Sequence, residues 1–141
     1  LKNITEEVIT KNPEVKIGVE KHADYTIYAD KVHFGNLVYN LLDNAIKYAE
    51  KTPEINIKLS ESKDYLQLEF SDNGVGIPLK DQKMIFKKFY RVPSANPVHG
   101  FGLGLFYVKK ICQQHRWKLK FSSLPGFGTN FRIIVPKSIG S

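Results

Sequence analysis

The 141-residue sequence contains one cysteine, and it has no long apolar run, no internal repeat and no low-complexity linker. Cys112 alone excludes an internal disulfide framework and fits a reducing compartment. No stretch approaches the roughly 18 apolar residues of a membrane span, and the start LKNITEEVIT has no signal-peptide run. With 42% hydrophobic and 25% charged residues, the composition indicates one globular domain.

The net charge of +7 favours an anionic partner. Nucleotide phosphates, nucleic acid and acidic proteins are all compatible with that charge. A nucleic-acid surface would use Lys87-Lys88, Lys109-Lys110, Lys118 and Lys120. No reader helix or RNA-binding motif accompanies these lysines, so a nucleic-acid-binding module is the weaker alternative.

Hydrophobic periodicity predicts an alternation of helices and hairpins. Helices are expected at residues 1–11, 32 to about 50 (with Asp30 as N-cap), 79–90 and 102–115. Strands are expected at residues 15–20, 24–29, 54–60, 65–71, 117–123 and 129–135, and a proline-containing loop at 91–99. The expected inward side chains of the third helix are Met84, Ile85, Phe86 and Phe89. Because helices alternate with hairpins rather than with single strands, a doubly wound parallel sheet is disfavoured.

Four short segments carry residues suited to a nucleoside triphosphate. They are NLLDNAIKY (40–48), DNGVGI (72–77), GFGLGL (100–105) and GFGT (126–129). In the first, Asn40, Asn44 and Lys47 are spaced i, i+4, i+7 and share a helix face. Asparagine oxygens can ligate Mg²⁺ beside phosphates, and a lysine can offset phosphate charge. A plain solvated face is the alternative reading of this segment.

The second segment is a tight turn with more glycine than a turn requires. Gly74 and Gly76 let the backbone pass close to a flat ring. Asp72 can accept a hydrogen bond from the exocyclic amine of adenine, where guanine has an acceptor instead. A buried mismatch of this kind costs about 1–3 kcal/mol, so the segment favours adenine.

The third segment is a glycine-rich turn that leads into a helix N-terminus. Free N–H groups and the positive end of the helix dipole suit a triphosphate there. Leu105 stands where a dinucleotide fingerprint has its third glycine, and no Gly-Lys-Ser/Thr completes a Walker loop. A flexible hinge is the alternative for this segment, and a simple β-turn is the alternative for the fourth.

Together and in this order, the four segments resemble the N, G1, G2 and G3 boxes of the ATP-binding domain of sensor histidine kinases, over residues 15 to about 136. The resemblance implies a two-layer α/β sandwich, with a mixed, mostly antiparallel sheet of about five strands and three helices on one face. It also implies transfer of the γ-phosphoryl group of Mg-ATP to a histidine on another domain, a reaction that depends mainly on positioning and charge stabilisation.

The resemblance also assigns roles to individual residues. Asn40 and Lys47 would be catalytic, Asn44 and Asn40 would hold the metal, and Asp72 would read adenine with support from Thr129. The expected nucleotide-binding set is Asn44, Lys47, Tyr48, Asp72, Gly74, Gly76, Ile77, Arg91, Gly100, Gly102, Leu103, Gly104, Leu105 and Thr129. Arg91 lies in IFKKFYR, which resembles the family's F-box, and a plain surface arginine is the alternative reading of it. Phe86 and Phe89 of the same segment are expected as core anchors.

This sequence departs from the family pattern in two places. Arg116-Trp117 stands where many members have Gly-Gly, and the expected lid, residues 92–99, is short. A third difference separates it from the hydrolases of the same superfamily, the gyrase, chaperone and mismatch-repair ATPases. Those enzymes place a general-base glutamate at the first N-box position, which is Asn40 here, so a built-in hydrolase is disfavoured.

The phosphoacceptor motif of such kinases, a histidine followed by an acidic residue, is not found. The four histidines of the sequence, at positions 22, 33, 99 and 115, are followed by Ala, Phe, Gly and Arg. Residues 1–12 are therefore predicted to be the connector from an upstream dimerisation domain, and residues 13–141 the catalytic domain. The expected partners are that domain in a homodimeric parent and, indirectly, a response regulator; nucleic acid is not expected. The expected location is cytoplasmic, with an inner-membrane anchor on the parent left open.

Overall fold

The structure, a computed structural model, describes residues 2–21, 29–91 and 104–137. Two of its three helices precede the central hairpin and the third follows it. The elements in chain order are α1 (Lys2–Lys11), β1 (Lys16–Lys21), α2 (Lys31–Lys47), β2 (Glu54–Glu61), β3 (Tyr65–Asp72), the short 3₁₀ helix η1 (Leu79–Asp81), α3 (Gly104–Gln114), β4 (Lys118–Leu124) and β5 (Gly128–Pro136).

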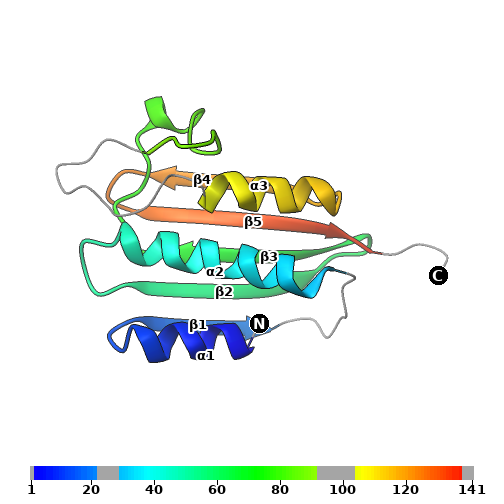
Figure 1. The fold of residues 1–141 in the computed structure, drawn as a ribbon, viewed down its shortest axis with the longest axis horizontal. Helices are drawn as coiled ribbons and strands as arrows, with labels where there is room; N and C mark the ends of the chain where they lie inside the picture. Colours follow the sequence, from blue (N-terminus) through cyan, green and yellow to red (C-terminus); the bar gives the residue numbers. More distant parts are fainter. Residues whose placement is uncertain (1, 22–28, 92–103, 138–141) are drawn as a thin grey trace.

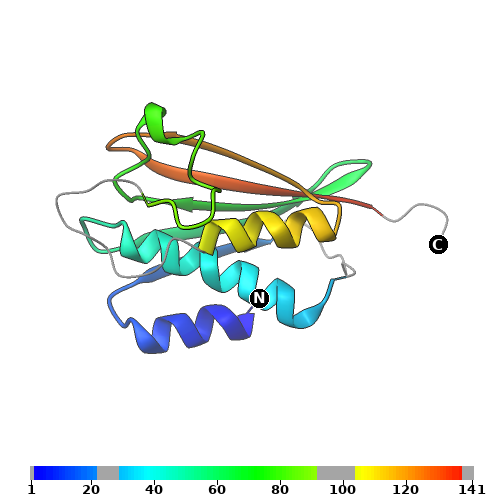
Figure 2. The same cartoon turned by 45° about the horizontal axis from the view of Figure 1, so that its top comes forward.

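The five strands form one sheet in the order β1-β2-β3-β5-β4. β1 is parallel to β2, and the other three neighbouring pairs are antiparallel. All three helices lie on one side of this sheet (Figures 1 and 2). The expected two-layer sandwich with a mixed, mostly antiparallel sheet is confirmed.

The core lies between the helices and the inward-facing residues of the strands. Alternation in β2, β3 and β5 directs one residue in two toward the helices. The largest fully buried side chains come from both layers: Leu37, Leu42, Ile57, Leu66, Ile133, Val38, Val108 and Cys112. Each buried aliphatic side chain stabilises the fold by about 1.5–3 kcal/mol. Burial of this face fixes the register, and therefore the places where the strands end.

Most predicted elements agree with the structure to within two or three residues at each end. The N-cap is also confirmed, because the Asp30 carboxylate accepts from the backbone N–H groups of Val32 and His33 at 3.0 Å each. The expected strand at 24–29 falls almost entirely on residues 22–28, which lie outside the described residues. The expected loop and lid at 92–99 lie outside them as well.

The helix predicted at residues 79–90 is wrong. After η1 the chain makes tight turns closed by i→i+3 bonds, such as Met84 N–H to Asp81 O and Lys87 N–H to Met84 O, both 2.9 Å. The Tyr90 hydroxyl also donates to the buried Asp81 carboxylate, which folds the segment back on itself. Phe89 has φ +68°, a left-handed conformation that interrupts any right-handed helix.

The same segment buries only part of the apolar side that the helical pattern predicted. Ile85 is buried, and Phe86 packs edge-on against Phe121 and Phe131, with ring centroids 5.6 and 6.4 Å apart. Phe89 is 63% exposed, so its expected role as a core anchor is wrong. The Lys88 ammonium lies 5.4 Å from its ring centroid, over one ring face.

The Arg116-Trp117 pair has a structural explanation. Arg116 takes the left-handed conformation, φ +59°, that glycine adopts more readily. Trp117 is buried and meets the Phe34 ring edge-on at 6.3 Å, and it stacks on His115 at 4.5 Å. The His115 ring in turn accepts a hydrogen bond from Asp30 N–H. The tryptophan therefore joins the C-terminal end of α3 to the start of α2.

Helix α1 belongs to the packed structure. Val8 is 3% exposed and is part of the core, together with Val15 just before β1. The assignment of residues 1–12 as a connector stays a prediction.

Candidate nucleotide-binding site

Asp72 lies at the last position of β3, where its carboxylate is held by backbone groups. Oδ1 accepts from Gly74 N–H at 2.8 Å and from Thr129 N–H at 3.2 Å. Both bonds use the same oxygen, which leaves Oδ2 for a further donor. Burial raises the pKa of the Asp72 carboxyl, and the bonds from Gly74 and Thr129 oppose that rise. The result is a partly desolvated acceptor in a fixed orientation.

A chain of hydroxyl groups supports Asp72 from the neighbouring strands. Ser123 on β4 donates from Oγ to the Gly128 carbonyl at 3.0 Å, and its Oγ lies 2.8 Å from Thr129 Oγ1. Because the single hydroxyl hydrogen of Ser123 is used by Gly128, the Thr129 hydroxyl donates to Ser123. Ser123 Oγ also accepts from Ile77 N–H at 2.7 Å. One serine therefore connects the 72–77 segment to the 126–129 segment.

The glycines of the 72–77 segment allow close backbone approaches. Gly76 has φ +78°, and a Cβ built there would lie 2.2 Å from the Leu124 carbonyl oxygen. A Cβ on Gly74 would lie 3.1 Å from the Tyr48 carbonyl oxygen, which accepts from Val75 N–H at 3.1 Å. The turn is thus packed against both the end of α2 and the β4–β5 turn. Only glycine fits at position 76.

Asn40 and Asn44 lie half-buried on α2, one turn apart. Among the described residues neither side-chain amide has a hydrogen-bond partner. Asn40 Oδ1 lies beside the first residue of α3, since a Cβ on Gly104 would be 3.4 Å from it. The described residues also contain no cluster of three or more His, Cys, Asp or Glu that could hold a metal.

Lys47 forms an ion pair within α2. Its Nζ lies 2.8 Å from Asp43 Oδ2, one turn earlier, and both side chains are about one-third exposed. A phosphate would have to compete with Asp43 or share the lysine with it. This pair tempers the charge that Lys47 would offer to a nucleotide.

The remaining predicted site residues are placed in part. Gly104 begins α3, and Leu105 packs its side chain against the core, so only the backbone of Leu105 is suited to ligand contact. Arg91 is exposed at the end of the 79–91 segment. Gly100, Gly102 and Leu103 lie outside the described residues.

Sequence reasoning missed four residues that organise the site. Ser123 and Asp43 are described above. The Gln82 amide donates to the carbonyls of Ile77 at 3.0 Å and Ser123 at 3.1 Å. Asn73 fastens the turn to the start of β2, since its Oδ1 accepts from Glu54 N–H at 2.9 Å. Only the Asp43–Lys47 spacing of four residues was a readable signal.

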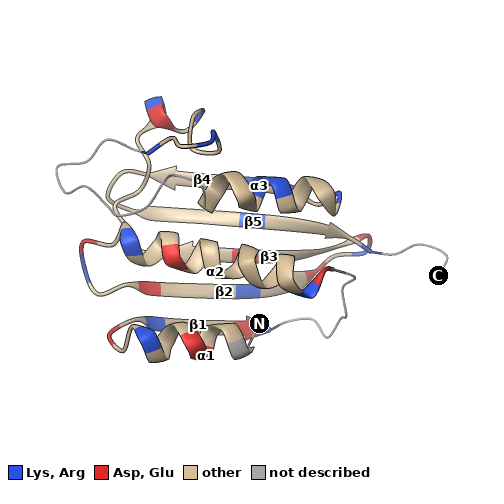
Figure 3. Ribbon diagram, in the orientation of Figure 1, with Lys and Arg blue, Asp and Glu red and all other residues tan. Residues whose placement is uncertain are grey.

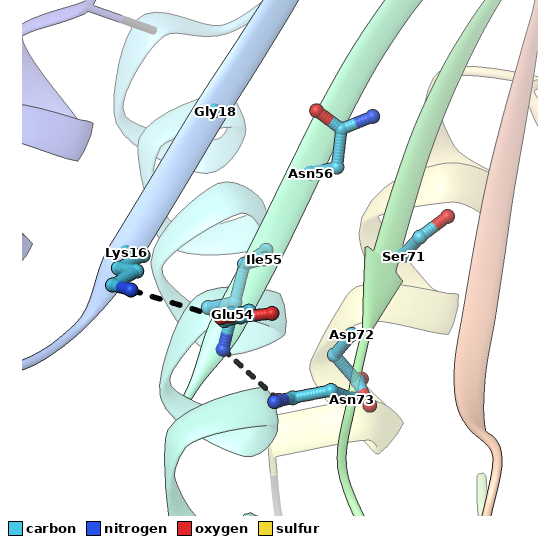
Figure 4. A pocket seen from close by; sticks show the side chains of 8 residues that line it. All are labelled: Lys16, Gly18, Glu54, Ile55, Asn56, Ser71, Asp72 and Asn73. Carbon is cyan, nitrogen blue, oxygen red and sulfur yellow. Dashed lines mark hydrogen bonds and ion pairs between the residues drawn. The ribbon is translucent and has the colours of Figure 1, made fainter. Parts of the chain in front are cut away.

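A separate hollow of about 380 Å³ opens near the ends of β1, β2 and β3 (Figure 4). Gly18, Asn56 and Ser71 lie in register across these strands, on the sheet face that the helices leave uncovered. The Lys16–Glu54 ion pair, 3.9 Å long, stands at one side. The hollow contains Asp72 but none of the α2 residues, so we do not assign the nucleotide to it.

Comparisons with known proteins identify the family of this chain. Residues 29–139 match the family described as Histidine kinase-, DNA gyrase B-, and HSP90-like ATPase. Sensor protein RprX of Bacteroides fragilis (strain YCH46) is 43% identical over 116 residues, which are 78% of this chain and 22% of that protein. Sensor-like histidine kinase SenX3 of Mycolicibacterium smegmatis is 28% identical over 92% of this chain and 34% of its own length. The chain therefore spans between about a fifth and a third of these curated relatives.

A solved structure gives the same result. The mycobacterial sensor histidine kinase MprB superposes with a TM-score of 0.86 at 26% identity, covering 96% of this chain and 91% of that one. The chain belongs to the histidine kinase-, DNA gyrase B- and HSP90-like ATPase family, and within it to the catalytic ATP-binding domains of sensor histidine kinases.

Proposed function

We propose that this domain binds Mg-ATP and presents the γ-phosphoryl group to a histidine on a separate dimerisation domain of the same protein. The observation that carries the proposal is the joined arrangement of Asp72 and α2. The turn after Asp72 is bonded to the Tyr48 carbonyl at the end of α2, one turn from Asn44. A single ligand can therefore reach both the carboxylate and the two asparagines.

Asp72 would recognise the base. Its Oδ1 is held by two backbone donors, so Oδ2 is the atom that would accept the exocyclic amine of adenine. Gly74 and Gly76 let the turn after Asp72 pack closely against the Tyr48 and Leu124 carbonyls, and Thr129 supports the carboxylate through its own N–H. This arrangement rejects guanine, which would place an acceptor against the carboxylate.

Asn44 would be the main protein ligand of Mg²⁺, with Asn40 and Lys47 serving the phosphates. The fit rests on two half-buried amides that have no partner among the described residues, and Asn40 lies beside Gly104, the first residue of α3. When bound, the metal supplies charge neutralisation for the phosphates. The contribution of the chain itself is orientation: the amides fix the phosphate direction, and the α3 N-terminus donates backbone N–H groups.

The acceptor histidine would come from the dimerisation domain, in a homodimeric parent that passes the phosphoryl group to a response regulator. Within the described residues no helix is both long and apolar enough to cross a membrane. We propose a cytoplasmic position for this domain and an anchored parent.

ATP hydrolysis at an enzymatic rate is not expected. The Asn40 amide cannot take a proton from water near neutral pH. The nearest carboxylate on α2, Asp43, is paired with Lys47. The bound nucleotide should therefore remain intact until the acceptor domain arrives.

Two measurements test this function together. Calorimetric titration with a non-hydrolysable ATP analogue, with and without Mg²⁺, should show binding that the metal strengthens. The chain mixed with its own dimerisation domain and γ-labelled ATP should then label that domain's histidine, and Asp72→Ala should abolish the label. Label on the isolated 141-residue chain, or no label on the dimerisation domain despite confirmed binding, contradicts the proposal.

A further inference from the structure

Charge is divided unevenly along this chain. Residues 82–141 contain eleven Lys and Arg and no Asp or Glu, whereas residues 1–81 contain ten Lys and Arg and fourteen Asp and Glu. The fold keeps the two groups apart, because α3, β4 and β5 lie on one side of the sheet order and β1 and β2 on the other (Figure 3). The side that carries β4 is therefore strongly basic.

Two loops on this basic side present large apolar side chains to solvent. Leu79 on η1 is 80% exposed, and Leu124 and Phe127 at the β4–β5 turn are 65% and 83% exposed. We refer to these three side chains as the apolar tip. Phe127 and Leu79 are the two most exposed large hydrophobic side chains of the described residues.

Hydrogen bonds hold the two loops together. Gln82, three residues after Leu79, donates to the Ser123 carbonyl, and Gly126 N–H donates to the Val75 carbonyl at 2.8 Å. The Gly76–Leu124 approach described above adds a tight backbone contact. The loops that carry the apolar tip are therefore fixed by hydrogen bonds to each other, and the exposed side chains do not belong to a frayed segment.

Lysines accompany the tip without exposed acids between them. Lys80 and Lys83 are exposed in the same segment, followed by Lys87 and Lys88. The one carboxylate of this segment, Asp81, is 5% exposed and accepts the Tyr90 hydroxyl. It therefore offsets little of the positive field at the surface. Apolar side chains at loop tips, with lysines around them, are the combination that peripheral membrane-binding surfaces use.

We propose that the apolar tip docks on an anionic lipid bilayer, with Leu79, Leu124 and Phe127 in the headgroup region and the lysines on the lipid phosphates. A second copy of this chain fits poorly, because two surfaces of one sign would meet. Nucleic acid would leave the three apolar side chains without a partner. A bilayer accepts side chains from two separate turns, because it has no fixed grooves to match.

Vesicle flotation tests the proposal with the chain as it is. The protein should float with vesicles of phosphatidylcholine containing about 30% phosphatidylglycerol at low salt, and not with phosphatidylcholine alone. Raising the salt to about 0.5 M should reduce binding several-fold, because surface charges are screened. Circular dichroism and thermal melting would verify that each variant is folded.

Matched variants separate the contribution of the apolar side chains from that of the lysines. The Leu124→Ser/Phe127→Ser and Lys80→Glu/Lys83→Glu variants should each weaken binding about tenfold or more. The controls are Val32→Ser, at an exposed apolar residue of α2, and Lys51→Glu, at an exposed lysine before β2. Both should bind as the unmodified chain does.

Three results would overturn the proposal. One is the absence of flotation with anionic vesicles at low salt. Another is equal loss in tip and control variants, which would show that binding does not depend on the apolar tip or on the lysines beside it. The third is tip-dependent capture of duplex DNA or of an acidic protein, while vesicles remain unbound.

Discussion

The two ends of the proposed nucleotide site are constructed differently. At the base end, Asp72, Thr129, Ser123 and Ile77 are joined by hydrogen bonds of 2.7–3.2 Å, which leave Oδ2 of Asp72 as the open acceptor. At the phosphate end, the Asn40 and Asn44 amides have no partner among the described residues. At the base end the protein itself supplies most of the hydrogen-bond partners, whereas at the phosphate end the two amides are left to bind a ligand.

This difference assigns separate tasks to the two ends. A pre-bonded acceptor loses little freedom on binding and rejects a wrong base through a fixed mismatch. Free amides adapt to a metal and to phosphates whose positions change during transfer. Substitutions at the base end should therefore change both folding and binding, and those at the phosphate end binding alone.

The largest effect is expected for Asp72→Ala. Loss of the carboxylate removes the acceptor for adenine, so ATP affinity should fall on the order of 100-fold, with most of the fold retained. Calorimetric titration measures the affinity. Unchanged affinity in a folded variant would remove Asp72 from the site.

Asp72→Asn is the control variant, because it keeps the size of the side chain and removes its titration. It also allows a test of how the stability of the fold depends on pH. The folded-state pKa of Asp72 is raised by burial. The unmodified chain should therefore lose stability relative to Asp72→Asn as pH rises from below about 4 through the folded pKa toward neutrality. Urea unfolding at several pH values measures this difference. If the unmodified chain instead gains stability relative to Asp72→Asn as pH rises toward neutrality, the hydrogen bonds from Gly74 and Thr129 outweigh burial in setting the pKa of Asp72.

Ser123→Ala should have the next largest effect. It removes the acceptor for Ile77 N–H and the donor to the Gly128 carbonyl, which should lower the free energy of unfolding by about 1–3 kcal/mol. Ser122→Ala, at the exposed neighbouring position, should change it by less than about 0.5 kcal/mol. Equal effects in chemical denaturation would mean that the serine bridge contributes nothing.

Asn44→Ala should separate binding from folding. Mg²⁺-dependent affinity should fall on the order of tenfold, and metal-free affinity should fall less. The free energy of unfolding should stay within about 0.5 kcal/mol, because no protein partner is lost and alanine is the better helix former. Asn36→Ala, at an exposed asparagine of the same helix, is the control. Equal losses with and without metal would argue against a ligand role.

The smallest effect is expected for Asp43→Asn, which frees Lys47. Stability should fall by about 0.5 kcal/mol or less, and ATP affinity should rise two- to threefold, on the order of a surface ion pair. Glu7→Gln breaks the equivalent Glu7–Lys11 pair of α1, 3.2 Å long. It should give the same small stability change with no effect on affinity, and a rise in affinity there would contradict the explanation.

The sequence predicted the sheet well because one face of it is buried. Alternation in residues 54–71 reports that burial directly, and the hairpin follows from the short turn between the strands. The grouping of Asn40, Asn44 and Lys47 on one helix could also be predicted, since their i, i+4, i+7 spacing is visible in the sequence. The hydrogen bond that joins the 72–77 segment to Ser123 could not be predicted. Ser123 is a single hydroxyl residue in a strand, and nothing in the local sequence indicates that it binds Ile77, 46 residues away.

The failure at residues 79–90 has a different cause. Apolar residues at positions 84, 85, 86 and 89 satisfy a helical period. The backbone conformation is determined instead by hydrogen bonds from side chains that are not part of that pattern. The Gln82 amide binds the Ile77 and Ser123 carbonyls, and the Tyr90 hydroxyl binds Asp81. Long-range polar contacts of this type override a local periodicity.

The buried thiol of Cys112 can serve as an intrinsic probe of opening of the domain. It is the single cysteine of the chain, it is 1% exposed, and burial raises its pKa to about 12. Since the thiolate is the reactive form, an alkylating reagent at neutral pH modifies this residue only when α3 separates from the core. The labelling rate therefore counts opening events, and a ligand that binds the closed domain slows it in proportion to its occupancy. One unmodified sample thus reports both the stability of the fold and the binding of its nucleotide.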